Sequence, residues 1–163
     1  MASLARSLAA KAAALCSHLR QRRIYQKLVG EHGPASHRAA HWNSRRSQEI
    51  RFEVLVHELG GLAALADATV LDVGCGCGDF AAFLDRAGAQ PRELVGIDIV
   101  PAAISACARR WAAGDSAHTA FPRRFECCDL LLSPSWPTAH GPFDYVVSSG
   151  VFAFGDNTAP QPL

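Results

Sequence analysis

Short apolar runs alternate with amphipathic segments through the second half of the sequence. Each run has the length of a buried strand, and the segments between them repeat apolar residues at three- and four-residue steps, as helices do. Strands are predicted over 69–73, 94–99, 124–128 and 143–149, and helices over 79–86 and 101–113. This alternation indicates an α/β fold with a mostly parallel sheet and right-handed crossovers.

Two further helices are predicted ahead of the first strand. Residues 1–24 repeat leucine at four-residue spacing, which places the leucines of each pair on one side of a helix. A second helix is predicted from a cap at Asn43 or Ser44, with Gln48 near its first turn, to Leu59. The sheet is therefore preceded by an N-terminal helical segment.

The charge of the chain is uneven. Its 163 residues carry a net charge of +1, but the first 30 hold six basic residues and no acid. Three interpretations of this basic start stay open: an additional N-terminal helix, a mitochondrial targeting segment, or a basic arm for RNA or a membrane surface. The net charge of the whole chain gives no strong nucleic-acid signal.

Composition narrows the class of protein further. Hydrophobic residues make up 49% of the chain, enough for one domain with a buried core, and no apolar run has transmembrane length. The six cysteines form a poor disulfide framework, so we expect a reducing, cytoplasmic compartment. The pairs Cys75-x-Cys77 and Cys127-Cys128 are too closely spaced for a typical zinc site, and no metal is expected.

The predicted sheet is organised around Asp72-Val73-Gly74-Cys75-Gly76-Cys77-Gly78, which follows an apolar run and precedes an amphipathic one. A strand, a tight glycine turn and a helix start leave backbone N–H groups facing a ligand above the turn. The spacing departs from the dinucleotide pattern G-x-G-x-x-G, because the third glycine comes one residue early and Asp79 takes its place. The carboxylate of Asp72 would repel a pyrophosphate but suits a ligand that carries an amine.

This stretch resembles motif I of the class I S-adenosylmethionine-dependent methyltransferases, whose acidic, glycine-rich turn holds the methionine half of the cofactor. The resemblance covers roughly residues 45–155 and implies a Rossmann-like three-layer α/β/α fold with strand order 3-2-1-4. Residues 1–44 would form a basic helix and a cofactor lid, and 156–163 a disordered tail. The cofactor-binding residues implied within the turn are Asp72, Gly74, Cys75, Gly76 and Gly78.

The resemblance also gives roles to residues at the ends of later strands. Asp98 would accept the ribose hydroxyls, and Ile99 would contact the adenine face. Asp129 would bind the adenine amino group, and the backbone N–H of Leu130 would meet the ring. The alternatives are a helix-capping role for Asp98 and a turn-forming role for Asp129. The remaining implied positions, beside the sulfonium, are Ser148 and Ser149.

Candidate residues for catalysis are less specific. A general base is optional for methyl transfer, and the candidates are His32, His37 and His41, each of which is also an ordinary loop histidine. Arg46 or Arg51 on the second helix is a candidate for the methionine carboxylate, with a solvated arginine as the alternative.

The end of the sequence differs from the family fold, which has seven strands, because only four are predicted here. The apolar segments 145–147 and 151–154 would face water at a sheet edge. The sequence therefore predicts either a chain truncated after the fourth strand or a homodimer in which a second copy covers that edge. A narrower resemblance, to uncharacterised small bacterial methyltransferases, rests on Trp42-Asn43-Ser44-Arg45 and Ser149-Gly150-Val151-Phe152.

The leading hypothesis is an S-adenosylmethionine-dependent methyltransferase with an unidentified small-molecule or protein acceptor. One alternative is an inactive remnant that only binds the cofactor. The other is a NAD-dependent oxidoreductase, which the position of Gly78 and the acid at Asp72 disfavour. Binding of S-adenosylhomocysteine without binding of NAD would exclude the oxidoreductase.

Overall fold

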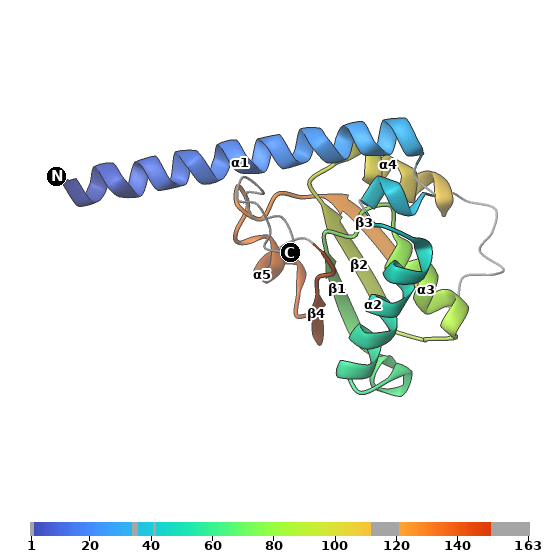
Figure 1. Ribbon diagram of the computed structural model, residues 1–163. Coiled ribbons are helices and arrows are strands. Elements are labelled where there is room, and N and C mark those ends of the chain that lie inside the picture. The colour runs from blue at the N-terminus through green and yellow to red at the C-terminus, as the bar shows by residue number, and fades with distance from the viewer. Residues whose placement is uncertain (1, 34–35, 41, 112–120, 151–163) are drawn as a thin grey trace, which may run out of the picture.

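The computed structural model of the protein describes residues 2–33, 36–40, 42–111 and 121–150. Its centre is a four-stranded parallel sheet in the order β3-β2-β1-β4 (Figure 1). The strands are β1 (Thr69–Val73), β2 (Glu93–Asp98), β3 (Arg123–Cys127) and β4 (Tyr145–Val147). The predicted α/β class and the predicted strand order 3-2-1-4 are confirmed.

The register of the sheet brings the ends of its strands together. Asp72 on β1 lies opposite Gly96 on β2 and Val147 on β4, and Asp98 on β2 lies opposite Cys127 on β3. Because all four strands are parallel, the segments that follow them leave at one edge of the sheet. Ligands of open α/β sheets bind in the crevice outside this edge.

Helices cover the two faces of the sheet unequally. One face packs against α2 (Arg45–Glu58), α3 (Asp79–Ala87) and α4 (Pro101–Arg110), and the short α5 (Trp136–His140) lies on the other (Figure 1). The first face buries Phe52, Phe80 and Leu84 in its core. On the second face, Leu71 and Val95 pack near Trp136. The central strand β1 is thus buried from both sides, as an α/β/α arrangement requires.

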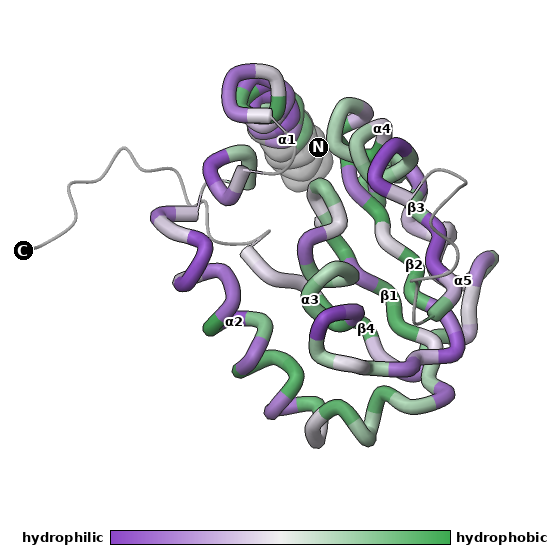
Figure 2. The backbone as a smooth tube through the Cα atoms, turned by 90° about the vertical axis from the view of Figure 1, so that its right-hand side faces the viewer, coloured by the Kyte–Doolittle hydropathy of each residue, from purple (hydrophilic) through white to green (hydrophobic). Residues whose placement is uncertain are grey.

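The helix α1 (Ala2–His32) is longer than the predicted helix over residues 1–24. Its 31 residues correspond to about 46 Å, and its N-terminal end projects away from the domain (Figure 1). Its C-terminal end lies beside α4 (Figure 2), where Val29 packs with Val100 and Ala103. Among the described residues, no helix is both long and apolar enough to cross a membrane.

Two 3-10 helices, η1 (His37–Ala40) and η2 (Leu62–Leu65), flank α2. The predicted cap of α2 at Ser44 is confirmed, since Ser44 Oγ accepts a hydrogen bond from the N–H of Ser47 at 3.0 Å. The reciprocal bond goes from the N–H of Ser44 to Ser47 Oγ at 3.2 Å, so Ser47 completes the cap. Gln48 lies at this first turn, as the sequence predicts, and is buried with its amide bonded to Asp79 of α3.

The edge strand β4 exposes Val146, whose relative exposure is 64%. No contact of the described residues tests the homodimer expected at this edge, and the homodimer stays a prediction. The apolar segment 151–154 and the predicted tail over 156–163 lie outside the described residues.

Candidate functional site

A cavity of about 750 Å³ opens beyond the carboxyl ends of the strands. Its walls come from α1, η1, α2, the glycine turn after β1, the end of β2, the segment after β3 and residues 149–150. This volume lies in the range of small-molecule sites, about 300–1,000 Å³. The location agrees with the crevice that the parallel sheet predicts.

The glycine turn forms the floor of the cavity and is held by β2. The N–H groups of Gly74 and Cys75 donate to the carbonyl of Ile97 at 2.8 and 3.0 Å, and the N–H of Gly76 donates to Asp98 Oδ2 at 2.9 Å. Gly76 has φ +55°, and a Cβ added there would meet no atom within 4 Å. The turn is therefore fixed from below and open to a ligand from above.

Gly78 serves packing, because it faces away from the cavity. It begins α3 in the left-handed region with φ +75°, and a Cβ added there would lie 2.5 Å from the Trp111 ring and 3.2 Å from Cys107 Sγ. Trp111 itself stacks on Phe125 at 4.9 Å between ring centroids and is unable to yield easily. Gly78 thus lets α3 and α4 approach each other beneath the turn.

We expect Gly78→Ala to destabilise the protein by about 3 kcal/mol, because it adds overpacking against Trp111 to the strain of a positive φ. Gly76→Ala adds only the strain and is expected to cost about 1 kcal/mol. Urea unfolding of the two variants and the wild type measures the difference. Equal losses for both variants would show that Gly78 is not closely packed.

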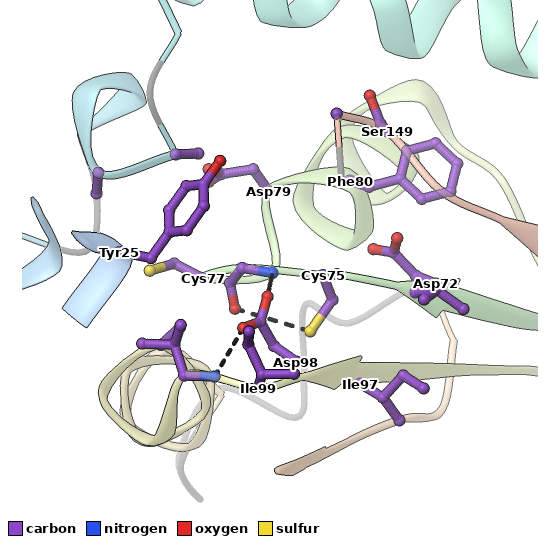
Figure 3. Close-up of a pocket in the computed structure, with 18 of the residues that line it drawn as sticks. Tyr25, Asp72, Cys75, Cys77, Asp79, Phe80, Ile97, Asp98, Ile99 and Ser149 are labelled. Carbon is purple, nitrogen blue, oxygen red and sulfur yellow. Dashed lines mark hydrogen bonds between the residues drawn. The ribbon is translucent and has the colours of Figure 1, made fainter. Parts of the chain in front are cut away.

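Asp98 ends β2 with both carboxylate oxygens fixed by the backbone. Oδ1 accepts the N–H of Val100 at 2.8 Å and Oδ2 accepts that of Gly76 at 2.9 Å (Figure 3). Burial raises the pKa of Asp98 above its ordinary value, and the hydrogen bonds from Val100 and Gly76 act in the opposite direction. Each oxygen retains a lone pair, so the carboxylate can still accept hydrogen bonds from a ligand.

Asp72 is a buried carboxyl group without a hydrogen bond or ion pair to any described residue, and only 4% of the residue is exposed. It lines the cavity beside the glycine turn, near Phe80 and Ser149 (Figure 3). Burial raises the pKa of Asp72 to about 7, and the charges of Asp98 and Asp79 add to the rise. A buried acid of this kind favours a cationic ligand, which would compensate its charge.

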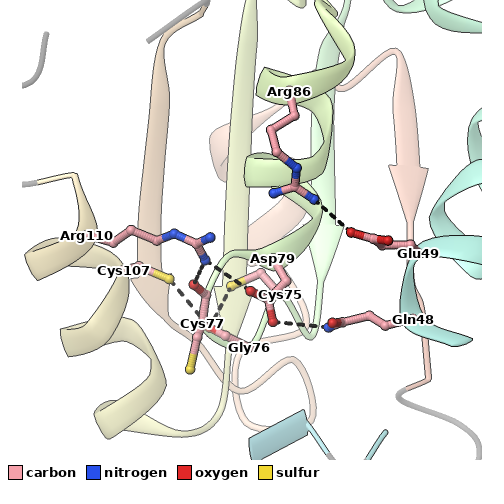
Figure 4. Close-up of polar contacts among 9 residues, drawn as sticks. All are labelled: Gln48, Glu49, Cys75, Gly76, Cys77, Asp79, Arg86, Cys107 and Arg110. Carbon is pink, nitrogen blue, oxygen red and sulfur yellow. Dashed lines mark hydrogen bonds and ion pairs between the residues drawn. The ribbon is translucent and has the colours of Figure 1, made fainter. Parts of the chain in front are cut away.

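Asp79, in contrast, has a hydrogen-bond partner on each carboxylate oxygen (Figure 4). Its Oδ1 accepts from Arg110 at 3.0 Å, and its Oδ2 accepts from Gln48 Nε2 at 3.1 Å. Arg110 also donates to the carbonyl of Cys77 at 3.2 Å. This network joins α2 and α4 to the start of α3 and holds the turn from the side.

The cysteines of the turn act as packing groups. The thiols of Cys75 and Cys107 lie 3.7 and 3.5 Å from the carbonyl oxygen of Gly76, to which they donate. Burial raises the pKa of Cys77 to about 12. A hydrogen bond with Cys107, together with burial, raises the pKa of Cys75 well above its usual range, so both thiols are neutral at physiological pH. Within the described ranges, no three His, Cys, Asp or Glu side chains are arranged to hold a metal ion.

The N-terminal segment, expected from the sequence to form a basic helix and a cofactor lid, contributes a wall of the cavity whose individual residues the sequence did not identify. His18, Gln21 and Tyr25 of α1 line it, three and four residues apart on one side of the helix. Burial raises the pKa of Tyr25 to about 12, with the charge of Asp98 adding to the rise. The sequence signal that could have identified these lining residues is the helical spacing, which continues past residue 24.

The catalytic candidates are placed differently by the structure. His32 and His37 do not line the cavity, and His41 lies outside the described residues. Arg46 pairs with Glu53 at 2.7 Å on the surface of α2. Arg51 lines the cavity, with its guanidinium 4.8 Å from the centre of the Trp42 ring.

Most of the predicted cofactor-binding residues gather at the cavity, and their binding roles stay predictions. Gly78 and Ser148 do not line it. The Oγ of Ser148 is buried and has no hydrogen-bond partner in the part of the chain that the structure describes. The predicted residues that line the cavity are Asp72, Gly74, Cys75, Gly76, Asp98, Ile99, Asp129, Leu130 and Ser149.

A parallel sheet in this order, with a glycine turn after β1 and an acid ending β2, defines a Rossmann-like cofactor-binding domain. The sequence profile of a family described as "Methyltransferase domain" matches residues 70–162, more than half of the chain. The chain belongs to this methyltransferase domain family. The resemblance drawn from the sequence is confirmed for the family and the fold.

Solved structures show the same fold. The magnesium protoporphyrin IX methyltransferase of Synechocystis PCC 6803 with bound SAH is 21% identical, with a TM-score of 0.51 over 83% of this chain. A phosphoethanolamine N-methyltransferase of Haemonchus contortus is 17% identical, with a TM-score of 0.51 over 77% of this chain. The chain spans 54% of the first and 24% of the second. No curated protein sequence matches significantly.

Proposed function

We propose that this chain binds S-adenosylmethionine in the cavity beyond the glycine turn and transfers its methyl group to an acceptor. The observation that carries the proposal is Asp72, a buried carboxyl group at the cavity wall that has no partner among the described residues. S-adenosylmethionine carries an ammonium and a sulfonium group, which would compensate this acid. The pyrophosphate of a dinucleotide would instead bring negative charge near the acid Asp72, which disfavours that ligand.

The residues of the chain fit the cofactor at each of its parts. The open turn at Gly76 gives the methionine portion close access to the backbone, and Arg51 lies at the cavity for its carboxylate. Asp98 is held with free lone pairs for the two ribose hydroxyls. Asp129 and the N–H of Leu130 would meet the adenine. The two structures compared above are described with bound SAH and with S-adenosylhomocysteine, which supports this ligand.

The chemistry of the bound cofactor is an electrophilic methyl group on its sulfonium. The contribution of this chain is positioning, since in-line displacement depends on holding the reacting atoms in line. Asp98 and the glycine turn fix one side of the ligand, α1 excludes water from the other, and residues 149–150 border the cavity where the acceptor would approach. Below its pKa of about 7, Asp72 holds a proton, which it would release when an ammonium group binds.

Calorimetric titration of the purified chain with S-adenosylhomocysteine, with NAD as the control, tests the proposal. We expect micromolar binding of S-adenosylhomocysteine and no heat from NAD. A folded, monodisperse chain that binds neither ligand would contradict the proposal. Binding without methyl transfer to any acceptor in a screen would instead favour the inactive remnant.

We expect a reducing, cytoplasmic compartment, because the spacing of the six cysteines is a poor disulfide framework. The alternative is mitochondrial, from the basic start of the sequence. The position of fluorescently tagged protein in cells distinguishes the two.

A further inference from the structure

The helix α1 borders the cavity and is joined to the segment after β3 by a side-chain pair. The Nε2 of His18 lies 2.6 Å from Oδ2 of Asp129, which follows β3 and is 111 residues away in the sequence. Both side chains are largely buried, with exposures of 15% and 17%. A carboxylate only accepts, so Nε2 carries the hydrogen and donates.

The carboxylate of Asp129 is held on both of its oxygens. While Oδ2 receives the hydrogen bond from His18, Oδ1 accepts the N–H of Leu131 at 3.0 Å. Hydrogen bonds to a charged group are short and strong, and two of them fix the orientation of the carboxylate. Each oxygen keeps a second lone pair for a ligand. His18, Asp129 and Leu131 all line the cavity, so the fixed carboxylate borders the ligand.

We propose that His18 is a positioning residue for base recognition: it holds the Asp129 carboxylate so that the site selects a 6-aminopurine over a 6-oxopurine. This inference rests on the proposed function. A 6-amino group donates a hydrogen bond to the fixed carboxylate, whereas a 6-oxo group sets an acceptor against it. A site built to pair with one polar group rejects an analogue that lacks it, because its own buried group is left unpaired.

Without His18, the Asp129 carboxylate loses one of its two hydrogen bonds and can turn toward solvent. The ligand must then order the carboxylate as it binds, and that cost falls only on a ligand that uses Asp129. The loss of His18 therefore lowers affinity for the aminopurine more than for the oxopurine. If α1 merely covered the cavity, the two affinities would fall together.

The experiment measures the dissociation constants of S-adenosylhomocysteine and S-inosylhomocysteine by calorimetry for five proteins. These are the wild type, His18→Leu, His18→Gln, Asp129→Asn and the control Arg23→Ala on the exposed side of α1. We expect the wild type to prefer the adenosyl compound roughly 100-fold, and His18→Leu to reduce this preference about tenfold. His18→Gln, whose amide still donates, and Arg23→Ala are expected to retain it.

Each result bears on the inference. Loss of the preference in His18→Leu and in Asp129→Asn, with rescue by His18→Gln, supports it. An unchanged preference in a folded His18→Leu, or an equal loss for both compounds, overturns it. A wild type that binds both compounds equally overturns the inference but leaves the proposed function standing. A wild type that binds neither overturns the proposed function itself.

Discussion

Replacing Asp98 with alanine is expected to weaken S-adenosylhomocysteine binding by at least about 100-fold, because two hydrogen bonds from the ribose to a charged acceptor are lost. The substitution also frees the N–H of Gly76, which Asp98 Oδ2 holds at 2.9 Å. The open turn would then lose one of the contacts that fix its shape before a ligand arrives. Calorimetric titration of Asp98→Ala beside the wild type measures the loss.

The fold is expected to survive this substitution. Burial raises the pKa of Asp98, so removing its charge relieves a desolvation cost, which offsets part of the loss of its hydrogen bonds to Val100 and Gly76. Asp98→Asn keeps one acceptor oxygen and should lose affinity about tenfold. Glu53→Ala, an exposed acid outside the cavity, is the control and should bind as the wild type does. Wild-type affinity in a folded Asp98→Ala would refute the ribose assignment.

The sheet was predictable because its sequence signals are local. The strand at Thr69–Val73 ends at a glycine turn, and the helix at Pro101 starts where proline is favoured, so both are found where the pattern predicts them. The parallel sheet then follows from the alternation of strands and helices, whereas the strand order 3-2-1-4 was implied by the family resemblance. The acids that end the strands, Asp98 and Asp129, reach the cavity for the same reason.

The α1 wall was not predictable in the same way. No local pattern shows that residues 18 and 129 meet, because their contact depends on where a long helix lies over the finished sheet. Gly78 shows the reverse case, in which a local sequence pattern exists but suggests a different role from the one that packing gives. Its place in the motif suggested a ligand contact, whereas the structure gives it a packing reason, the close approach of Trp111. A motif thus locates a turn, but the packing around it decides which glycine faces the ligand.

Asp72→Asn is expected to stabilise the free protein above pH 7 by about 2 to 4 kcal/mol. The folded-state pKa of Asp72 is raised from its ordinary 3.8 to about 7. Between these values the folded protein holds a proton that the unfolded chain has lost, so the stability of the wild type falls as the pH rises through this window. Below pH 4 Asp72 is largely protonated in both the folded and the unfolded state. The wild type and Asp72→Asn should then be equally stable to within about 1 kcal/mol.

Urea unfolding at pH 4 and pH 8 measures this difference. Asp67→Asn is the control, because Asp67 is exposed and asparagine tolerates its positive φ of 57°. Its stability should follow that of the wild type at both pH values. If Asp72→Asn gave no more stability at pH 8 than at pH 4, the raised pKa of Asp72 would be excluded.

Asp72→Asn should also weaken binding of the ligand, although it stabilises the fold. An ammonium group beside Asp72 lowers its pKa, so the wild type releases close to one proton when S-adenosylhomocysteine binds at pH 6 and little at pH 8. The dependence of the binding enthalpy on the buffer's ionisation enthalpy counts these protons. Asp72→Asn should release none and bind about tenfold or more weakly. The charge of Asp72 thus destabilises the free protein at pH 8, and the same charge binds the ammonium group of the ligand. An Asp72→Asn protein that gained stability at pH 8 without losing affinity would show that Asp72 does not bind the ligand's cation.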